Sequence, residues 1–368
     1  MKKFLSFAKS EIILVISFFL AIVSMFFVHP SLKYLDYINF SVLIILFCLM
    51  ITVAGMRNIG FFKMLSDLML KKAGNSRKLG FIMMNICFFS SMLITNDVAL
   101  ITFVPLTILI LEKSDNFKDL ILIAVIETVA ANLGSAMTPV GNPHNLYIYS
   151  YYNLSIGVFF KTMFPFVAIS YVLLSLLCFA LSKNQLAPKH GSANRKLSKA
   201  HLLIYFILFI ISLLTVLKII PDYICLAITL ITVLIVKRKL LLKVDYSLLF
   251  TFVFFFIFVG NAGRIDAIRD FISNIVIGRE ILVAAALSQV LSNVPTTVML
   301  SGFTDNAIDL LKGVTLGGLG TPIASMASLI TYKFYVKSKN ANVGAYMKYF
   351  LFINFAFMAI LMIYALYS

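Results

Sequence analysis

Charged residues are scarce in this chain, at 12% of 368 residues, whereas 61% of the residues are hydrophobic. A soluble domain carries about 25% charged residues, and no stretch of this chain is polar enough to be one. A nucleotide-binding loop of the form Gly-x-x-x-x-Gly-Lys-[Ser/Thr] is also lacking. The longest polar connection, residues 183–200, is too short to fold alone. We therefore expect a membrane protein that takes its energy from an ion gradient or from a partner protein.

Cysteine and histidine are rare as well, with four residues of each. The cysteines lie within apolar runs without any Cys-x-x-Cys or Cys/His ligand spacing, which predicts buried free thiols and no transition-metal site. No Ser/His pair or His/Glu metal motif lies at a common depth, so we expect neither an enzyme nor a cofactor. The basic residues behind the net charge of +16 are scattered between apolar runs, unlike the concentrated basic face that binds nucleic acid.

Apolar runs of the length that crosses a bilayer, about 17 to 25 residues, recur from end to end. Two further apolar stretches, 79–111 and 280–303, have a polar interruption at their centres. We predict that each is a re-entrant hairpin, which enters and leaves the membrane on one side. Such backbone is tolerated only beside protein or a water-filled cavity, so the hairpin tips indicate a site. The nine predicted crossings are 12–28, 38–55, 118–149, 156–182, 202–220, 222–236, 246–262, 306–336 and 346–367.

The basic residues predict the orientation of these crossings. With the N-terminus in the cytoplasm, 24 of the lysines and arginines lie on the cytoplasmic side and 7 on the outer side, as the positive-inside rule requires. We therefore expect a multi-pass protein of the bacterial inner membrane with its C-terminus outside. In this topology Ser192 is cytoplasmic and Asn274 is external.

The sequence repeats itself where it is most polar. Residues 133–142 align without gaps on residues 316–325, and both stretches have the order Leu-Gly-x-x-x-Thr-Pro. Each stretch follows a hairpin tip in which a hydroxyl residue precedes an asparagine, Thr95-Asn96 in the first and Ser292-Asn293 in the second. Polar breaks of this kind in two corresponding halves are typical of secondary transporters.

The number of crossings between corresponding spans predicts that the halves are inverted. An odd number of crossings separates 38–55 from 246–262, so the sequence predicts an all-α polytopic membrane protein with two inverted-topology repeats. Each repeat has a re-entrant hairpin, a broken transmembrane helix and an amphipathic interfacial stretch, at 59–72 and 265–276. The predicted parts are a first repeat (1–182, with hairpin 79–111), a cytoplasmic linker (183–200), a connecting transmembrane helix (201–221) and a second inverted repeat (222–368, with hairpin 280–303).

The hairpin tips have the residues of an anion site. We expect Asn96 and Asn293 to be the N-caps of the second helix of each hairpin, with Pro295 in its first turn. Free backbone N–H groups and the positive end of the helix dipole would then face the tip and favour an anion. The predicted substrate-binding residues of the tips and breaks are Thr95, Asn96, Ser292, Asn293, Thr138, Asn142 and Thr321.

The breaks at 134–142 and 317–325 should also free carbonyl oxygens and hydroxyls, which are ligands for a hard cation such as sodium. An alternative is that their small residues only let helices pack closely, although packing requires neither an asparagine beside a hydroxyl residue nor the same residue order in both halves. The predicted cation-binding residues are Asn96, Asp97, Gly134, Ser135, Gly141, Asn293, Gly317, Gly320 and Ala324.

Three ionisable side chains are predicted at membrane depth. An ionised Asp97 would cost about 2.5 to 3.5 kcal/mol there, so a sodium ion or a helix N-terminus neutralises it, or it takes up a proton during transport. A purely structural Asp97, fixed by the N–H groups of its own helix, is the alternative. Glu127 is a weaker candidate for a proton site and could equally make a structural hydrogen bond. We interpret His144 as a packing or interfacial residue.

The stretches 95–106, 291–295 and 316–328 resemble those of an ion transporter superfamily. It includes divalent-anion/sodium symporters, bacterial citrate transporters, arsenite efflux pumps and one class of sodium/proton antiporters. The resemblance covers nearly the whole chain and is greatest for the citrate-transporter-like permeases. It implies a homodimer in which a transport domain that bears the hairpins slides against a scaffold domain, with the interfacial helices connecting the two.

The resemblance also bears on the site. In the dicarboxylate symporters each hairpin tip reads Ser-Asn-Thr, and the family's binding role carries over to Thr95, Asn96, Ser292 and Asn293. The third residue is Asp97 in the first tip and Val294 in the second. An Asn-Asp pair is more similar to the arsenite pumps and the antiporters.

The predicted function is ion-coupled secondary active transport of a small anion, most simply a di- or tricarboxylate such as citrate, with sodium or a proton as the coupling ion. Proton-coupled arsenite efflux and sodium/proton antiport are the alternatives. A channel would instead require a continuous polar stripe along several helices. The expected partners are the anionic solute, the coupling ion, the lipid bilayer and a second copy of the chain.

Overall fold

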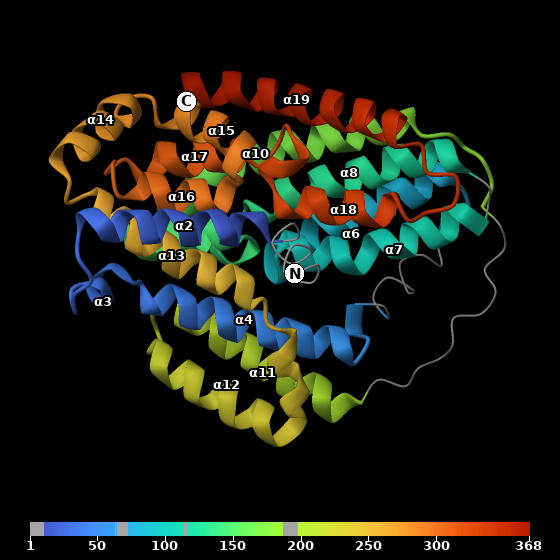
Figure 1. The fold of residues 1–368 in the computed structure, drawn as a ribbon. Coiled ribbons are helices and arrows are strands. Elements are labelled where there is room, and N and C mark those ends of the chain that lie inside the picture. The colour runs from blue at the N-terminus through green and yellow to red at the C-terminus, as the bar shows by residue number, and fades with distance from the viewer. Residues whose placement is uncertain (1–10, 63, 65–72, 114–115, 187–197) are drawn as a thin grey trace, which may run out of the picture.

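The computed structural model describes residues 11–62, 64, 73–113, 116–186 and 198–368. Within these ranges the protein consists of α-helices joined by short loops and 3-10 turns, without a β-strand (Figure 1). Five described helices are long and apolar enough to cross a membrane, or six if a bent pair counts as one span. The five are Phe40–Asn58, Ser76–Ile94, Ile156–Ala180, Lys199–Val216 and Val343–Tyr367. The expected all-α polytopic class is confirmed.

The molecule exposes large apolar side chains on its surface and buries several polar ones within an otherwise apolar core. Phe26 and Ile235 lie on the surface with 77% and 79% of their area exposed, whereas Asn96, Asn132 and Glu127 are buried. A soluble protein rarely exposes apolar patches of this kind, so the outer surface suits a lipid environment.

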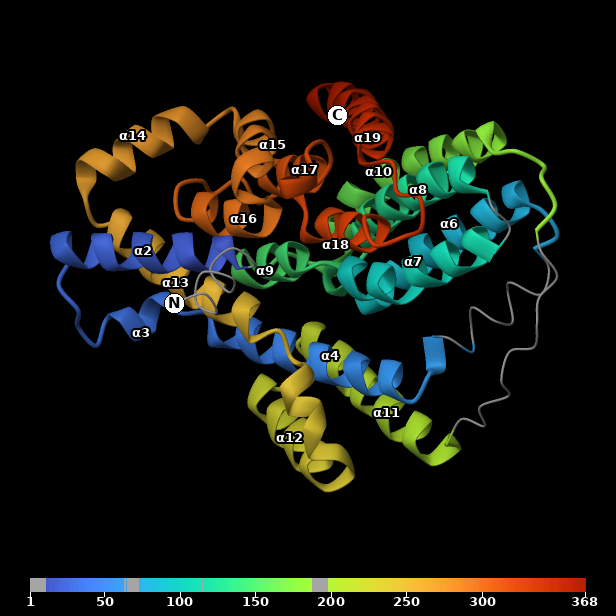
Figure 2. The same cartoon turned by 45° about the vertical axis from the view of Figure 1, so that its right-hand side comes forward.

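The helices form two groups, which Figure 2 shows on different sides of the molecule. The α4 group packs α4 against α11 and α12, and α13 against α2. It contains α2 (Ile12–Phe27), α3 (Tyr34–Tyr37), α4 (Phe40–Asn58), α11 (Lys199–Val216), α12 (Asp222–Lys237), η3 (Arg238–Lys243) and α13 (Tyr246–Ala262).

The second group, the α8 group, surrounds the central helix α8, which packs against α6, α7, α10, α18 and α19. Helix α8 is buried along nearly its whole length, as a helix that is apolar on all sides should be. The group contains α6 (Ser76–Ile94), α7 (Asn96–Lys113), α8 (Phe117–Ser135), η1 (Pro139–Gly141), α9 (Pro143–Tyr151), α10 (Ile156–Leu177), η2 (Cys178–Ala180), α15 (Glu280–Leu291), α16 (Asn293–Ser301), α17 (Ala307–Gly317), η4 (Pro322–Ala324), α18 (Met326–Tyr335) and α19 (Val343–Tyr367).

Helix α14 (Asp266–Val276) connects the two groups. It follows α13 after a bend of 107°, in agreement with the predicted amphipathic stretch 265–276. The corresponding stretch 59–72 lies mostly outside the described residues, as does Ser192 in the predicted linker.

Short polar side chains determine where many of the helices begin. Asn116 accepts a hydrogen bond from the backbone N–H of Asp119, and Asn306 does the same for Asp309, at the starts of α8 and α17. This N-cap contact satisfies an N–H group that has no partner within the helix. The same contact begins α4, α6, α13 and α19, at Asn39, Asn75, Asp245 and Asn342.

Each predicted hairpin is a pair of packed helices, α6–α7 and α15–α16, separated by a single residue. That residue is Thr95 in the first pair, with φ 71° and ψ 149°, and Ser292 in the second, with φ 71° and ψ 152°. Only glycine adopts this backbone region without strain, at a cost of about 1–3 kcal/mol for other residues. A strained conformation shared by both tips indicates a functional constraint there.

The nine predicted crossings are not all continuous helices. The predicted spans 118–149 and 306–336 are interrupted at η1 and η4. Helices α2, α12 and α13 have only 16 or 17 residues, which is about 24–26 Å at 1.5 Å per residue. Helix α6, the first arm of a predicted re-entrant hairpin, is itself long enough to cross. The crossing number and the inverted relation of the halves stay predictions.

Candidate functional site

Both hairpin tips and both helix breaks meet at one small cavity between the α4 and α8 groups. Its volume is about 20 Å³, which is room for about one water molecule or a small ion. The lining residues are Asn96 and Asp97 of the first tip, Asn142 and Pro143 of the first break, Asn293 and Val294 of the second tip, Ser325 and Met326 of the second break, and Asp245 and Leu248 at the start of α13. Of the predicted site residues, Asn96, Asp97, Asn142 and Asn293 line it.

The two tips differ from the prediction that Asn96 and Asn293 are N-caps. Helices α7 and α16 already include these asparagines as their first residues. Because Thr95 and Ser292 have positive φ angles, the chain turns sharply one residue before each asparagine. The Asn96 amide then donates to the Asn132 side-chain oxygen at 2.9 Å, while its own oxygen accepts from the Asp97 N–H at 2.9 Å. Pro295 lies in the first turn of α16, as predicted.

Asn132 of α8 supports the candidate site and was not predicted from the sequence. Its side-chain oxygen accepts from Asn96 and, at 3.1 Å, from the hydroxyl of Ser325, and its amide lies 3.4 Å from the hydroxyl of Ser328. It thereby joins the first tip to the second break. An amide near the middle of the predicted span 118–149 was the available signal.

Two other buried amides have no hydrogen-bond partner in the described part of the chain. The side chains of Asn142 and Asn293 both line the cavity, and each residue is only 4% exposed. Their amide groups are at the wall of the cavity and can bond a ligand there, so these two amides are the candidate ligand-binding groups.

Two carboxylates face the same cavity. One oxygen of Asp97 is buried without a hydrogen-bond partner in the described ranges, and Asp245 accepts from the N–H of Leu248 at 2.9 Å. No basic side chain lines the cavity within the described residues. The sequence did not indicate Asp245 as a site residue, because only the packing of α13 against α16 of the α8 group places it at the cavity.

The predicted hydroxyl ligands instead hold the breaks in place. The Thr138 hydroxyl donates to the carbonyl of Met92, and the Thr321 hydroxyl donates to the carbonyl of Gln289 at 2.9 Å. Ser292 donates to the carbonyl of Ala324 at 3.3 Å. None of these threonines and serines lines the cavity.

Some of the carbonyl oxygens at the breaks are already bonded by amides. Asn145 donates to the carbonyls of Ser135 and Thr138 at 3.1 and 3.2 Å. In the second break, Gln289 donates to the carbonyls of Gly317 and Leu319, at 3.0 Å each. These oxygens have less capacity left for a cation than the sequence suggests.

The glycines of the breaks have a packing role. A Cβ atom at Gly134 would lie 2.2 Å from the carbonyl oxygen of Phe88, and one at Gly141 would lie 2.1 Å from that of Ser135. A Cβ atom at Gly317 would lie 2.7 Å from the Ser288 side chain, and Gly320 has a φ of +99°. These residues, like Ala324, do not line the cavity.

Glu127 and His144 are buried but do not line the cavity. The Thr107 hydroxyl donates to one oxygen of Glu127 at 2.5 Å, and the other oxygen has no partner within the described chain. His144 lies 3.5 Å from the Thr315 hydroxyl through its Nε2 atom. Both therefore belong to the packed interior around α8 and not to the lining.

A helical membrane protein in which two broken helix pairs meet at a small polar cavity belongs to the class of secondary transporters. Comparison with known proteins agrees: the sequence model of the citrate transporter family matches residues 3–312, and the chain belongs to this family. An uncharacterized transporter of Methanocaldococcus jannaschii is 36% identical over 305 residues, 82% of each chain. The inner membrane protein YbiR of Escherichia coli K12 is 30% identical over 299 residues, 80% of each chain. The protein is thus a multi-pass anion transporter and not an enzyme.

Proposed function

We propose that this protein couples the transport of a small anion, a di- or tricarboxylate such as citrate, to a gradient of sodium ions or protons. The observation that carries this proposal is the convergence of both hairpin tips and both helix breaks on one cavity. The unpartnered amides of Asn142 and Asn293 supply hydrogen-bond donors for carboxylate oxygens. The starts of α7 and α16 add the positive ends of two helix dipoles.

The acidic residues of the cavity are the reason for coupling. An anionic solute beside Asp97 and Asp245 would be repelled unless a cation or a proton first neutralises these carboxylates. Binding of the coupling ion therefore has to accompany binding of the solute. The oxygens of Asp97, Asn96 and Asn293 are hard ligands of the kind that sodium prefers.

The position of the cavity supports an elevator mechanism. The α8 group contributes both tips and both breaks, whereas the α4 group contributes Asp245 and Leu248. Movement of the α8 group past the α4 group would carry the bound solute across the membrane, with α14 as the connection between the groups. In this proposal the α4 group is the scaffold, through which two copies of the chain form a homodimer.

A second candidate function is sodium/proton antiport or proton-coupled arsenite efflux. It is favoured by the two carboxylates and by the cavity volume of about 20 Å³, which suits a small ion better than citrate in this conformation. Citrate transport would require the α4 and α8 groups to separate at the cavity.

Transport by purified protein in proteoliposomes tests both candidates. Labelled citrate, arsenite and sodium are offered separately under an imposed sodium gradient, an imposed pH gradient or no gradient. We expect citrate accumulation that depends on one of the gradients. Sodium or arsenite movement without any carboxylate accumulation would replace the first candidate by the second, and gradient-independent flux of all solutes would contradict both.

A further inference from the structure

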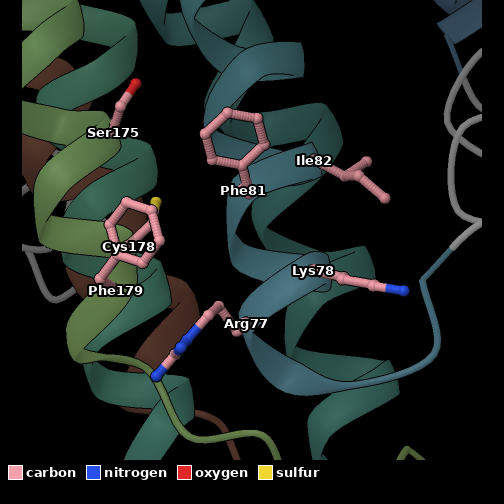
Figure 3. A pocket seen from close by; sticks show the side chains of 7 residues that line it. All are labelled: Arg77, Lys78, Phe81, Ile82, Ser175, Cys178 and Phe179. Atoms are coloured by element: carbon pink, nitrogen blue, oxygen red, sulfur yellow. The ribbon is translucent and has the colours of Figure 1, made fainter.

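A large groove lies between α6 and α10, away from the candidate site. Its volume is about 470 Å³, and it shares no lining residue with the smaller cavity. Figure 3 shows Phe81 and Phe179 between the two helices, with Arg77 at one end. The lining residues are Arg77, Lys78, Phe81, Ile82, Ser175, Cys178 and Phe179.

The walls of this groove are apolar and open to the outer surface. Phe81 is 42% exposed and Phe179 is 65% exposed, although both are large aromatic side chains. They belong to α6 and to the turn that follows α10, both on the outside of the α8 group. A groove of this composition on the surface of a membrane protein suits a hydrocarbon chain.

The end of the groove at the start of α6 carries two positive charges. The guanidinium group of Arg77 donates two hydrogen bonds to the carbonyl of Leu181, at 3.0 and 2.8 Å, and lies 5.9 Å from the Phe179 ring centre. Neither Arg77 nor Lys78 forms a salt bridge with a described residue. The carboxylate of Asp119 accepts hydrogen bonds from Ser182 instead. No described carboxylate therefore neutralises either charge, and Lys78 is exposed.

We propose that the groove binds an anionic phospholipid, with its phosphate at Arg77 and Lys78 and an acyl chain between Phe81 and Phe179. The distribution of basic residues predicts that this end of α6 lies on the cytoplasmic side, where anionic headgroups attract basic residues near the membrane surface. Arg77 already ties the start of α6 to the chain after α10 through Leu181. The bound lipid would occupy the same junction and hold the first arm of the hairpin against α10.

The chain contains no tryptophan, so a single Phe81→Trp substitution gives a fluorescent reporter inside the groove. The variant is reconstituted into vesicles with increasing fractions of brominated phosphatidylglycerol or brominated phosphatidylcholine, whose bromine atoms quench tryptophan on contact. We expect phosphatidylglycerol to reach half-maximal quenching at a lower mole fraction than phosphatidylcholine. The difference should be roughly fivefold for each basic side chain that contacts the headgroup. Equal quenching by the two lipids would overturn the proposal.

A matched pair of charge variants separates a specific site from general surface attraction. Lys78→Gln in the reporter background should reduce the preference for phosphatidylglycerol by about fivefold. Lys237→Gln, at the exposed end of α12 outside the groove, should leave it unchanged. An equal effect of both variants would show that only the overall positive charge attracts the lipid.

Native mass spectrometry of the chain with its original Phe81 provides an independent readout. Protein released from detergent containing both lipids should retain phosphatidylglycerol in preference to phosphatidylcholine. The Lys78→Gln variant should lose this retained lipid, and Lys237→Gln should keep it. Retention of neither lipid by the unmodified chain would contradict the proposal.

Discussion

The two hairpins have nearly the same backbone but different side chains at the site. Thr95 and Ser292 share a φ of 71°, with ψ values of 149° and 152°. Behind each tip a threonine of the following break, Thr138 or Thr321, donates to a carbonyl of the first helix of that hairpin. The polar tip and the bracing threonine thus recur together in both halves, as an internal repeat would produce.

The difference between the hairpins begins with the residue after Thr95 and Ser292. Asn96 is hydrogen-bonded to Asn132, whereas the Asn293 amide has no partner among the described residues. The next residue is the acidic Asp97 in the first tip and the apolar Val294 in the second, and both line the cavity. We infer that the first tip is anchored and holds the coupling ion, while the second tip binds the solute.

The largest expected effect distinguishes the two asparagines. Asn293→Ala should lower transport by about tenfold to a hundredfold, because a hydrogen bond to a charged group contributes about 1.5–3 kcal/mol. Its thermal stability should stay unchanged, since the amide has no partner within the described protein. Uptake into proteoliposomes and thermal unfolding in detergent measure the two quantities.

Asn96→Ala is the comparison variant. It should also lower transport, but with a loss of stability of about 1–3 kcal/mol, because the Asn132 side-chain oxygen loses one of its two hydrogen bonds and the Asp97 N–H loses its acceptor. The same loss of stability in both variants would show that the tips do not differ in anchoring. Normal transport by either variant would show that the hairpin tips have only a structural role.

The second expected effect concerns Asp97. Asp97→Asn keeps the shape of the side chain and removes its charge, so gradient-driven accumulation should be lost while exchange of solute across the membrane remains. Transport should no longer depend on the sodium or pH gradient, whichever drives the unmodified protein. Counterflow and net uptake, measured on the same vesicles, separate the two activities. Unaltered accumulation with the same ion dependence would remove Asp97 from the coupling mechanism.

A smaller effect is expected at Asp245, which faces the same cavity from the α4 group. Because Asp245 is exposed and its charge is screened, Asp245→Asn should change the half-saturating concentration of the coupling ion by roughly twofold to fivefold. Asp222→Asn, at the start of α12 and outside the cavity, is the matched control. An equal change in both variants would mean that Asp245 acts only through the general surface charge.

The hairpin tips and the helix breaks could be predicted from the sequence. A polar interruption within an apolar run identifies each tip, and the order Leu-Gly-x-x-x-Thr-Pro identifies each break, because both features depend on neighbouring residues. The amphipathic period of residues 265–276 likewise predicted α14. The candidate residues Asn96, Asp97, Asn142 and Asn293 were found in this way.

Contacts between distant segments could not be predicted in the same way. Asn132 joins Asn96, 36 residues before it, to Ser325, 193 residues after it, and Asp245 reaches the cavity only through the packing of α13. The roles of Gly134 and Asn145 also depend on tertiary structure, because one permits close approach to Phe88 and the other occupies carbonyl oxygens of the break. The spacing of apolar residues along the chain gives no information about contacts between distant segments.

The smallest expected effect tests whether the shared tip geometry is strained. Thr95→Gly should stabilise the protein by about 1 kcal/mol, because relief of about 1–3 kcal/mol of backbone strain outweighs the entropy cost of glycine, about 0.5–1 kcal/mol. Ser292→Gly should gain less, since it also loses the hydrogen bond to the Ala324 carbonyl. Thr102→Gly, within α7, is the control and should instead destabilise by up to about 1 kcal/mol. Thermal unfolding in detergent measures all three. If Thr95→Gly were as destabilising as Thr102→Gly, the tips would be relaxed turns, and their shared φ of 71° would give no evidence of a functional constraint.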